Sequence, residues 1–296
     1  MFRQKTGSVV CASCGSLVGV NDDKCYNCGR RNPGLWGFGP VLRRFGNDLG
    51  FVSLVVYGCI AMYFISLVLT MITGGNVLGG GGGFGAIFSL LGPSSFSAEV
   101  LGAAGAGPVF YDRRWWSVLT AGWLHAGALH ILFNMLWVRE LGPVVADTYG
   151  AARMVIIYTI AGVAGFALSS VAGYYVHLPF FGAGLTLGAS APIFGLLGAL
   201  VHYGRRGGSS LIHGQATSYA ITLFVMGLIM PGVDNAAHAG GFAGGYLTAM
   251  WLDPLKRERM DHFVGAALCL AATVIAVVVS VITAWSDIMF RMSYRG

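Results

Sequence analysis

Residues 51–73 read FVSLVVYGCIAMYFISLVLTMIT, and this stretch decides the class of protein. It contains no charged side chain, and a helix of this length, rising about 1.5 Å per residue, exceeds a hydrocarbon core of about 30 Å. Over all 296 residues, 55% are hydrophobic, 10% are charged and the mean hydropathy is +0.69, whereas soluble chains carry about 25% charged residues. The composition excludes disordered and coiled-coil proteins and predicts an all-α polytopic membrane protein.

Seven apolar stretches have the length of a membrane-spanning helix, and they define a six-helix core plus one additional C-terminal helix. The predicted spans are 51–73, 128–147, 151–175, 190–204, 218–230, 236–251 and 263–285. Between the first two lies a long apolar loop, 74–116, which contains five consecutive glycines. We expect this loop to be partly embedded in the membrane interface and buried against protein, because lipid cannot satisfy its backbone.

The distribution of basic residues predicts the orientation. With a cytoplasmic N-terminus, fourteen of the eighteen lysines and arginines lie inside; cytoplasmic loops of membrane proteins carry such an excess. The outer side then keeps four, namely Arg113, Arg114, Arg291 and Arg295. In a membrane protein this positive charge reports topology, so no nucleic-acid partner is expected.

Four cysteines near the N-terminus have the spacing of a zinc ribbon. They form two C-x-x-C pairs, each followed by glycine: Cys11, Cys14, Cys25 and Cys28. Four thiolates make a closed tetrahedral site, so the zinc would be structural rather than catalytic. Two disulfides are the alternative, which a reducing cytoplasm disfavours. Cys59 and Cys269 lie inside apolar spans and are interpreted as small buried hydrophobic residues.

Polar side chains open three of the predicted spans. His130 and Asn134 are four residues apart and share one helix face, with His125 just before them. Ser190 precedes Pro192, which a helix tolerates only near its start, so Ser190 has unpaired backbone N–H groups beside it. The sixth span begins with a histidine, His238, followed by overlapping G-x-x-x-G pairs that let it approach the fourth span closely.

All three spans start at the outer side, so the topology brings these residues to one depth. A lone intramembrane serine is usually a packing residue, and a buried histidine can be structural. Together, however, one serine, three histidines and one asparagine supply a nucleophile, a base and oxyanion donors. Polar residues are also expensive in hydrocarbon, which favours a functional interpretation.

The order H-x4-H-x3-N, G-x-S and A-H-x-x-G-x-x-x-G resembles the rhomboid intramembrane serine proteases, over roughly residues 51–255. The resemblance implies that Ser190 is the nucleophile and His238 its general base, in a dyad that needs no cofactor. Asn134 and His130, with the Ser190 backbone N–H, would stabilise the oxyanion, and His125 would shape the site and its water access. It further implies hydrolysis of a peptide bond in or near a transmembrane segment of a substrate protein.

Two further positions follow from the same resemblance. Phe194, one turn after Ser190, matches the aromatic residue against which the family's histidine ring packs. Asp234, four residues before His238, is available as a third catalytic member, but it lies in a polar loop and a dyad is preferred.

The chain departs from the family pattern at two positions. Ala191 stands where the family usually has glycine, and its methyl group could tighten the oxyanion pocket. The family's Trp-Arg pair appears as Trp116-Ser117, so the contacts of that arginine are either missing or supplied by Arg113 or Arg114.

Two other functions remain open at this stage. One is a catalytically inactive rhomboid-like protein that binds transmembrane segments. The other is a zinc-ribbon membrane sensor or transporter, which would distribute polar residues along the whole membrane depth rather than at one end.

The sequence thus predicts a zinc ribbon at 1–35, a linker at 36–50, a rhomboid-like membrane core at 51–255 and an additional helix and tail at 256–296. The expected surroundings are a lipid bilayer, most simply a prokaryotic plasma membrane, with the site toward the outer side. The expected partners are transmembrane substrates and a still unidentified cytoplasmic partner of the ribbon.

Overall fold

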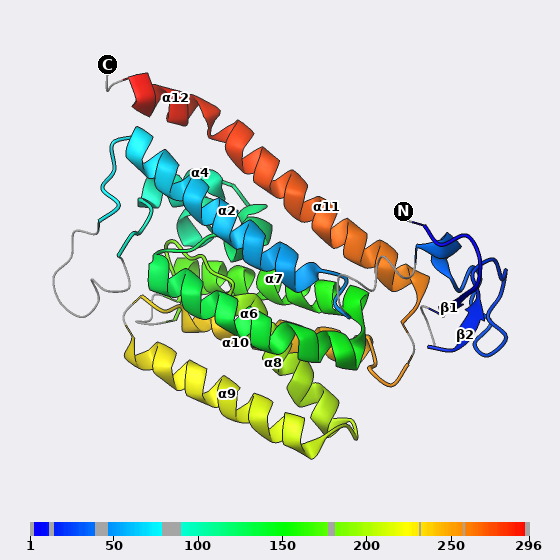
Figure 1. Cartoon of the computed structure of the whole chain (residues 1–296). Helices are drawn as coiled ribbons and strands as arrows, with labels where there is room; N and C mark the ends of the chain where they lie inside the picture. The colour runs from blue at the N-terminus through cyan, green and yellow to red at the C-terminus, as the bar shows by residue number, and fades with distance from the viewer. Residues whose placement is uncertain are drawn as a thin grey trace.

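The computed structural model describes residues 3–11, 15–38, 47–78, 90–176, 181–230, 232–256 and 258–293. Its main body is a bundle of helices with a small β-hairpin domain at one end (Figure 1). The seven long helices are α2 (Phe51–Ile72), α6 (Ala128–Tyr149), α7 (Ala151–Tyr175), α8 (Ser190–Arg205), α9 (Ser210–Ile229), α10 (Asn235–Trp251) and α11 (Met260–Thr283).

Four of these helices are long and apolar enough to cross a membrane on their own, namely α2, α7, α9 and α11. A fifth span arises if α6 is joined to the short helices before it, which meet it at a 94° bend. The remaining two, α8 and α10, have 16 and 17 residues, about 24 to 26 Å of helix. All seven predicted spans therefore correspond to helices, and the two short ones carry Ser190 and His238.

Two predicted boundaries were wrong. The fifth span starts at Ser210, eight residues before the predicted start, because Ser209 caps it by accepting a hydrogen bond from the backbone N–H of Ile212. Its first turns carry polar residues that hid the helix from a hydropathy search. The seventh helix starts at Met260, where His262 Nδ1 accepts the backbone N–H of Arg259.

Helices α8 and α10 pack with almost no side chains between them. A Cβ atom on Gly241 would lie 2.1 Å from the carbonyl oxygen of Ala191, and one on Gly245 would lie 2.1 Å from the carbonyl oxygen of Gly195. Only glycine permits this approach, as the G-x-x-x-G pattern predicted. Helix α7 lies against both, and its buried residues cover most of its length.

The first loop and the residues that follow it as far as Trp123 fold into short helices. These are α4 (Ser95–Leu101), a π-helical turn η2 (Gly107–Tyr111), α5 (Ser117–Thr120) and η3 (Ala121–Trp123). The backbone of the loop pairs with the segment that leads into α8, since Ala104 and Thr186 exchange hydrogen bonds of 2.9 and 2.7 Å. Ala104 is fully buried, so the prediction of a loop packed against protein is confirmed here. The five-glycine run lies outside the described residues.

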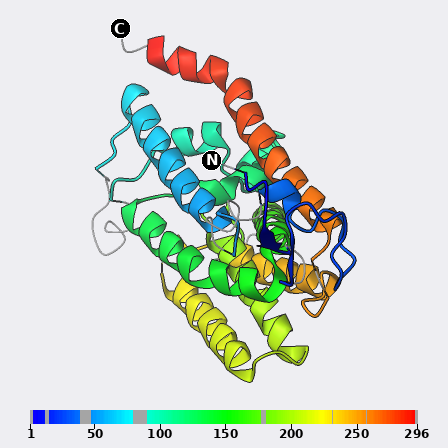
Figure 2. The ribbon, with the colours of Figure 1, turned by 45° about the vertical axis from the view of Figure 1, so that its right-hand side comes forward.

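The N-terminal domain is a hairpin of β1 (Ser8–Val10) and β2 (Leu17–Gly19), followed by the 3-10 turn η1 (Leu35–Gly37). Figures 1 and 2 place it beside the start of α11, while the C-terminal helix α12 (Trp285–Ser293) lies at the other end of the molecule. Arg30 of this domain donates to Met260 Sδ at 3.2 Å. Helix α11 therefore connects the two ends, over about 36 Å for its 24 residues.

Candidate active site

Ser190 is the first residue of α8 and is partly accessible. Pro192 occupies the first turn, where its missing N–H has no consequence. The first-turn N–H groups of a helix have no intrahelical acceptor, so the backbone beside Ser190 offers free donors. The predicted position of Ser190 at the head of a helix is confirmed.

His238 lies in the first turn of α10 and faces α8. Its ring stacks on Phe194, with ring centroids 4.2 Å apart and an interplanar angle of 18°. The residues next to the proposed dyad also converge, because a Cβ on Gly165 of α7 would lie 2.8 Å from Ala191 Cβ and 2.6 Å from the carbonyl oxygen of Ala237. The heads of the two helices thus meet, although no hydrogen bond joins Ser190 Oγ to His238 within the described part of the chain.

Asp234 is engaged away from the His238 ring. It caps α10, accepting from the backbone N–H of Ala237 at 3.1 Å with one oxygen and from the Ser169 hydroxyl with the other. His238 Nδ1 is buried and has no hydrogen-bond partner among the described residues. This arrangement favours a two-residue rather than a three-residue site.

His130 borders the same space as Ser190. Its Nδ1 accepts the backbone N–H of Ala126 at 3.3 Å, so the neutral ring carries its proton on Nε2. That Nε2 lies 2.7 Å, and Ser190 Oγ 3.8 Å, from the point where a Cβ on Gly188 would stand. Gly188 therefore lets the His130 ring pack directly against the backbone two residues before Ser190, which brings an N–H donor and the hydroxyl close together. The sequence did not reveal this contact.

Asn134 and His125 complete the predicted set. Asn134 lies one turn after His130 and donates from Nδ2 to the His130 carbonyl oxygen at 2.8 Å. His125 is almost fully buried, with its ring 5.2 Å from that of His130, and neither of its ring nitrogens has a hydrogen-bond partner in the described ranges. His125 thus lies beside the His130 ring, and Asn134 lies one helical turn after His130.

The comparison with protein families decides which fold class this is. Residues 112–254 match the family model described as Rhomboid domain. The chain carries a rhomboid domain. This match contains all five predicted site residues, and it begins within the first loop.

Curated relatives of the rhomboid domain include active and inactive proteins. RHOMBOID-like protein 7 of Arabidopsis thaliana is 35% identical over 55% of this chain and 51% of its own length. Rhomboid protease GluP of Bacillus subtilis is 31% identical over 60% of this chain and 34% of its own length. Inactive RHOMBOID-like protein 8 of Arabidopsis thaliana is 27% identical over 52% and 42%. The chain thus spans about half or less of these relatives.

The methyl group of Ala191 packs between helices of this rhomboid domain. Ala191 is fully buried in an apolar cluster with Ala121, Phe166 and Ala237, and its Cβ faces Gly165, which has no side chain. The methyl group occupies space between helices, and its effect on the proposed oxyanion pocket stays a prediction.

In the first loop, Arg114 is the arginine whose side chain bonds to neighbouring backbone. Its Nη1 donates to the carbonyl oxygen of Glu99 at 2.6 Å, and its Nη2 to that of Val100 at 3.2 Å. Burial lowers the pKa of this guanidinium, and the nearby Asp112 opposes the shift. Ser117, which stands at the family's arginine position, is fully buried.

Polar residues are buried at the opposite end of the bundle as well. Tyr149 donates to the carbonyl oxygen of Ala199 at 2.9 Å and lies 3.2 Å from His202 Nδ1. Arg153 donates to the carbonyl oxygens of Asp253 and Lys256 at 3.2 and 2.7 Å. The expectation that polar residues gather at one end was therefore incomplete. Arg153 holds the connection between α10 and α11, whereas Tyr149 bonds to α8.

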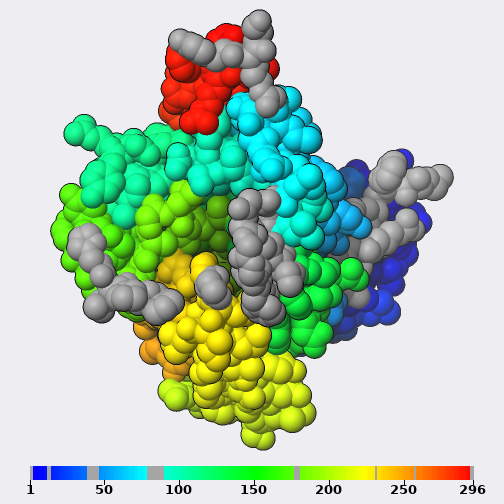
Figure 3. Space-filling model, turned by 90° about the vertical axis from the view of Figure 1, so that its left-hand side faces the viewer, coloured from blue at the N-terminus to red at the C-terminus, as the bar shows by residue number. Residues whose placement is uncertain are grey.

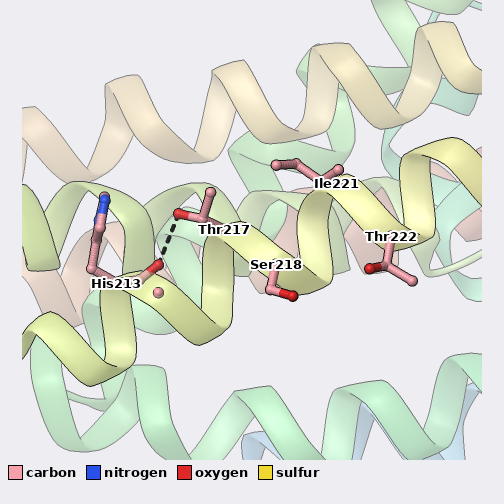
Figure 4. Close-up of a pocket in the computed structure, with 6 residues that line it drawn as sticks. His213, Thr217, Ser218, Ile221 and Thr222 are labelled. Carbon is pink, nitrogen blue, oxygen red and sulfur yellow. Dashed lines mark hydrogen bonds between the residues drawn. The ribbon is translucent and has the colours of Figure 1, made fainter.

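A shallow groove runs along α9 (Figure 4). It is lined by His213, Gly214, Thr217, Ser218, Ile221 and Thr222. Thr217 is bonded to the carbonyl oxygen of His213 at 2.8 Å, and none of the predicted site residues lines this groove.

Three cysteine sulfurs lie close together in the described part of the N-terminal domain. The Sγ atoms of Cys11, Cys25 and Cys28 lie within 4.8 Å of one another, whereas Cys14 lies outside the described residues. The 3.7 Å between Cys11 Sγ and Cys28 Sγ is too long for a disulfide of about 2.05 Å and is close to the roughly 3.8 Å expected for tetrahedral zinc with bonds of about 2.3 Å. These residues can hold a metal ion.

Proposed function

We propose that this rhomboid domain is an intramembrane serine endopeptidase that cleaves substrate proteins in or near a transmembrane segment by a Ser190–His238 dyad. The observation that carries the proposal is the stacking of the His238 ring on Phe194, one turn after Ser190. The stack fixes a base against the helix that carries the nucleophile. Catalytic hydrogen bonds often tighten only when substrate binds, so a resting pair need not be in contact.

In the proposed reaction, His238 takes the proton of Ser190 as Oγ attacks the substrate carbonyl carbon. The resulting tetrahedral intermediate collapses to an ester on Ser190, and His238 passes the proton to the leaving amine. Water, activated by His238 in the same way, then hydrolyses the ester and restores the serine.

The oxyanion would be held by N–H groups near the head of α8. These are His130 Nε2–H, the second amide hydrogen of Asn134 and the backbone N–H of Ser190. Such donors act where charge develops, and in a site with little water each is worth more than in solution. His125, buried behind His130, would fix the shape of the site.

The proposed orientation places the N-terminal domain in the cytoplasm and the active site toward the outer side of a prokaryotic plasma membrane. The N-terminal domain lies beside the start of α11 (Figure 1), whereas Trp116 of the first loop contacts Ser280 near the other end of that helix. This separation agrees with the excess of basic residues on the N-terminal side. The substrates would then be cleaved close to the outer surface, where their helix must unwind to expose a peptide bond.

The decisive experiment incubates purified protein in proteoliposomes with a panel of single-span substrates, beside Ser190→Ala and His238→Ala. We expect cleavage by the wild type and none above background by either variant. Cleavage that both variants retain would refute the dyad.

The second candidate is a protein that binds transmembrane segments without cleaving them, favoured by the similarity to an inactive relative. A fluorophosphonate probe separates the two functions. Labelling of the wild type that is absent from Ser190→Ala supports the protease, and failure of the wild type to label or cleave supports the binding protein.

For the N-terminal domain we propose a structural zinc ion held by Cys11, Cys14, Cys25 and Cys28. Four thiolates would leave no open coordination position, so the zinc would stabilise the ribbon without taking part in hydrolysis. Metal analysis should find one zinc per chain, and less in Cys11→Ser. A freshly reduced sample without zinc would contradict this proposal.

A further inference from the structure

The C-terminal helix α11 lies outside the matched rhomboid domain, yet it contacts the first loop, and a buried serine supplies the polar part of this contact. Ser280, near the end of α11, has no exposed surface. Its hydroxyl oxygen accepts the indole N–H of Trp116 at 3.1 Å, and its carbonyl oxygen accepts Arg114 Nη2 at 3.0 Å. A serine within a run of valines and alanines is thereby bonded to two side chains of the loop.

Arg114 joins three backbone segments because of this contact. It also donates to the carbonyl oxygens of Glu99 and Val100 in α4. All its bonds in the described structure go to carbonyl oxygens, so the guanidinium holds α4, the loop and α11 in one geometry. A planar group with fixed donor directions suits this role better than a flexible amine.

Apolar packing also joins the C-terminal helices to α4 and the first loop. Ala284, at the end of α11, and Ile288 of α12 are buried in a cluster with Ala98, Val100 and Leu101 of α4 and Leu124 of the loop. Arg291 of α12 stands 3.8 Å above the Phe96 ring. Figure 3 shows α12 (red) resting on the first-loop segment (teal).

The loop passes this constraint to the nucleophile through backbone hydrogen bonds. Ala104 is paired with Thr186, and the N–H of Gly188 donates to the carbonyl oxygen of Ala121 at 2.9 Å. Gly188 is two residues before Ser190 and adjoins His130. The chain segment that aims Ser190 and the oxyanion donors is therefore fastened to the loop that Ser280 holds.

We infer that Ser280 of the added C-terminal helix is a positioning residue for the proteolytic site, acting through Trp116, Arg114 and the first loop on the backbone before Ser190. The inference rests on the proposed function. The helix that the rhomboid domain match leaves out would thus be part of the working enzyme.

The test compares Ser280→Ala, Trp116→Phe and the double variant in proteoliposomes, with kcat expressed per site labelled by the fluorophosphonate probe. Each single variant should lower kcat about tenfold and leave KM within about twofold. The catalytic groups would shift, whereas the binding of substrate would be retained. The double variant should lose no more than one single variant, because both remove the same bond.

Val278→Ala is the matched control. Val278 lies two residues earlier on the same helix and its side chain is exposed, so its kcat should equal that of the wild type. Normal kcat per labelled site in Ser280→Ala would overturn the inference even if the variant were less stable, because a purely structural role changes only the number of active sites. A wild type that neither labels nor cleaves would instead refute the proposed function.

Discussion

Asn134 has two amide hydrogens, and the resting structure uses only one of them in the described residues. Nδ2 donates to the carbonyl oxygen of His130, which holds the amide against its own helix and leaves the second hydrogen for an oxyanion. We expect Asn134→Ala to lower kcat by about 10² to 10³-fold, as loss of one oxyanion donor does in soluble hydrolases. Initial rates at saturating substrate measure this effect.

The fluorophosphonate labelling stoichiometry is the control for Asn134→Ala. A variant that still labels in full has kept its nucleophile and fold, so the lost rate belongs to the oxyanion. If labelling and rate fall together, the side chain is structural.

For Asp234 we expect little loss of kcat, in contrast with Asn134. Because its carboxylate is engaged by Ala237 and Ser169, Asp234→Asn should keep kcat within a few-fold of the wild type. A catalytic aspartate would cost about 10⁴-fold on the same change. The loss should instead appear in stability, by about 1 kcal/mol or less for a weakened helix cap; thermal unfolding in detergent measures it.

Helices α8 and α10 depend on glycine for their contact. Gly241→Ala would place a Cβ atom 2.1 Å from the carbonyl oxygen of Ala191, so the helix that carries His238 must move away from the helix that carries Ser190. We expect a loss of about 1 to 3 kcal/mol in stability and at least a tenfold loss in kcat, since small displacements of catalytic groups are costly.

Gly214→Ala in α9 is the matched control for this substitution. A Cβ atom there meets nothing within 4 Å, and alanine is favoured over glycine in a helix by up to about 1 kcal/mol. Its stability and kcat should equal or exceed those of the wild type. Equal losses in both variants would show that the site does not depend on the α8–α10 contact.

The sequence predicted the elements better than their ends. Hydropathy located all seven long helices, because each is an apolar run bounded by polar residues. It missed the first turns of α9, which carry the polar residues His213 and Thr217. Both side chains bond to nearby backbone carbonyl oxygens, and a hydropathy average does not take such hydrogen bonds into account.

The site could be predicted as a set of residues but not as a geometry. Helix periodicity places His130 beside Asn134, and glycine spacing brings the fourth and sixth spans together. The contact between Ser280 and Trp116 joins residues 164 positions apart, and no local pattern marks it. The domain boundaries and the catalytic roles of the site residues remain predictions.

At the scale of the whole molecule, the N-terminal domain and the first-loop contact that supports the proposed active site lie near opposite ends of α11. The N-terminal domain contacts α11 at Met260, whereas the site is supported at Ser280. A helix of this length transmits a shift at one end only if it moves as a rigid body. The small contact at Met260 makes such transmission weak, so the ribbon and the site should behave as independent units.

Removing the proposed zinc ion tests this independence. A zinc chelator added to the full chain should make residues 3–38 sensitive to protease, because the small core around Val9, Val18 and Cys25 cannot fold without the ion. Probe labelling at Ser190 and kcat should stay within twofold of the untreated protein, and added zinc should restore protease resistance. Cys11→Ser should behave like the chelated wild type. Loss of labelling in step with loss of zinc, and its recovery on adding zinc back, would show instead that the ribbon controls the site through α11.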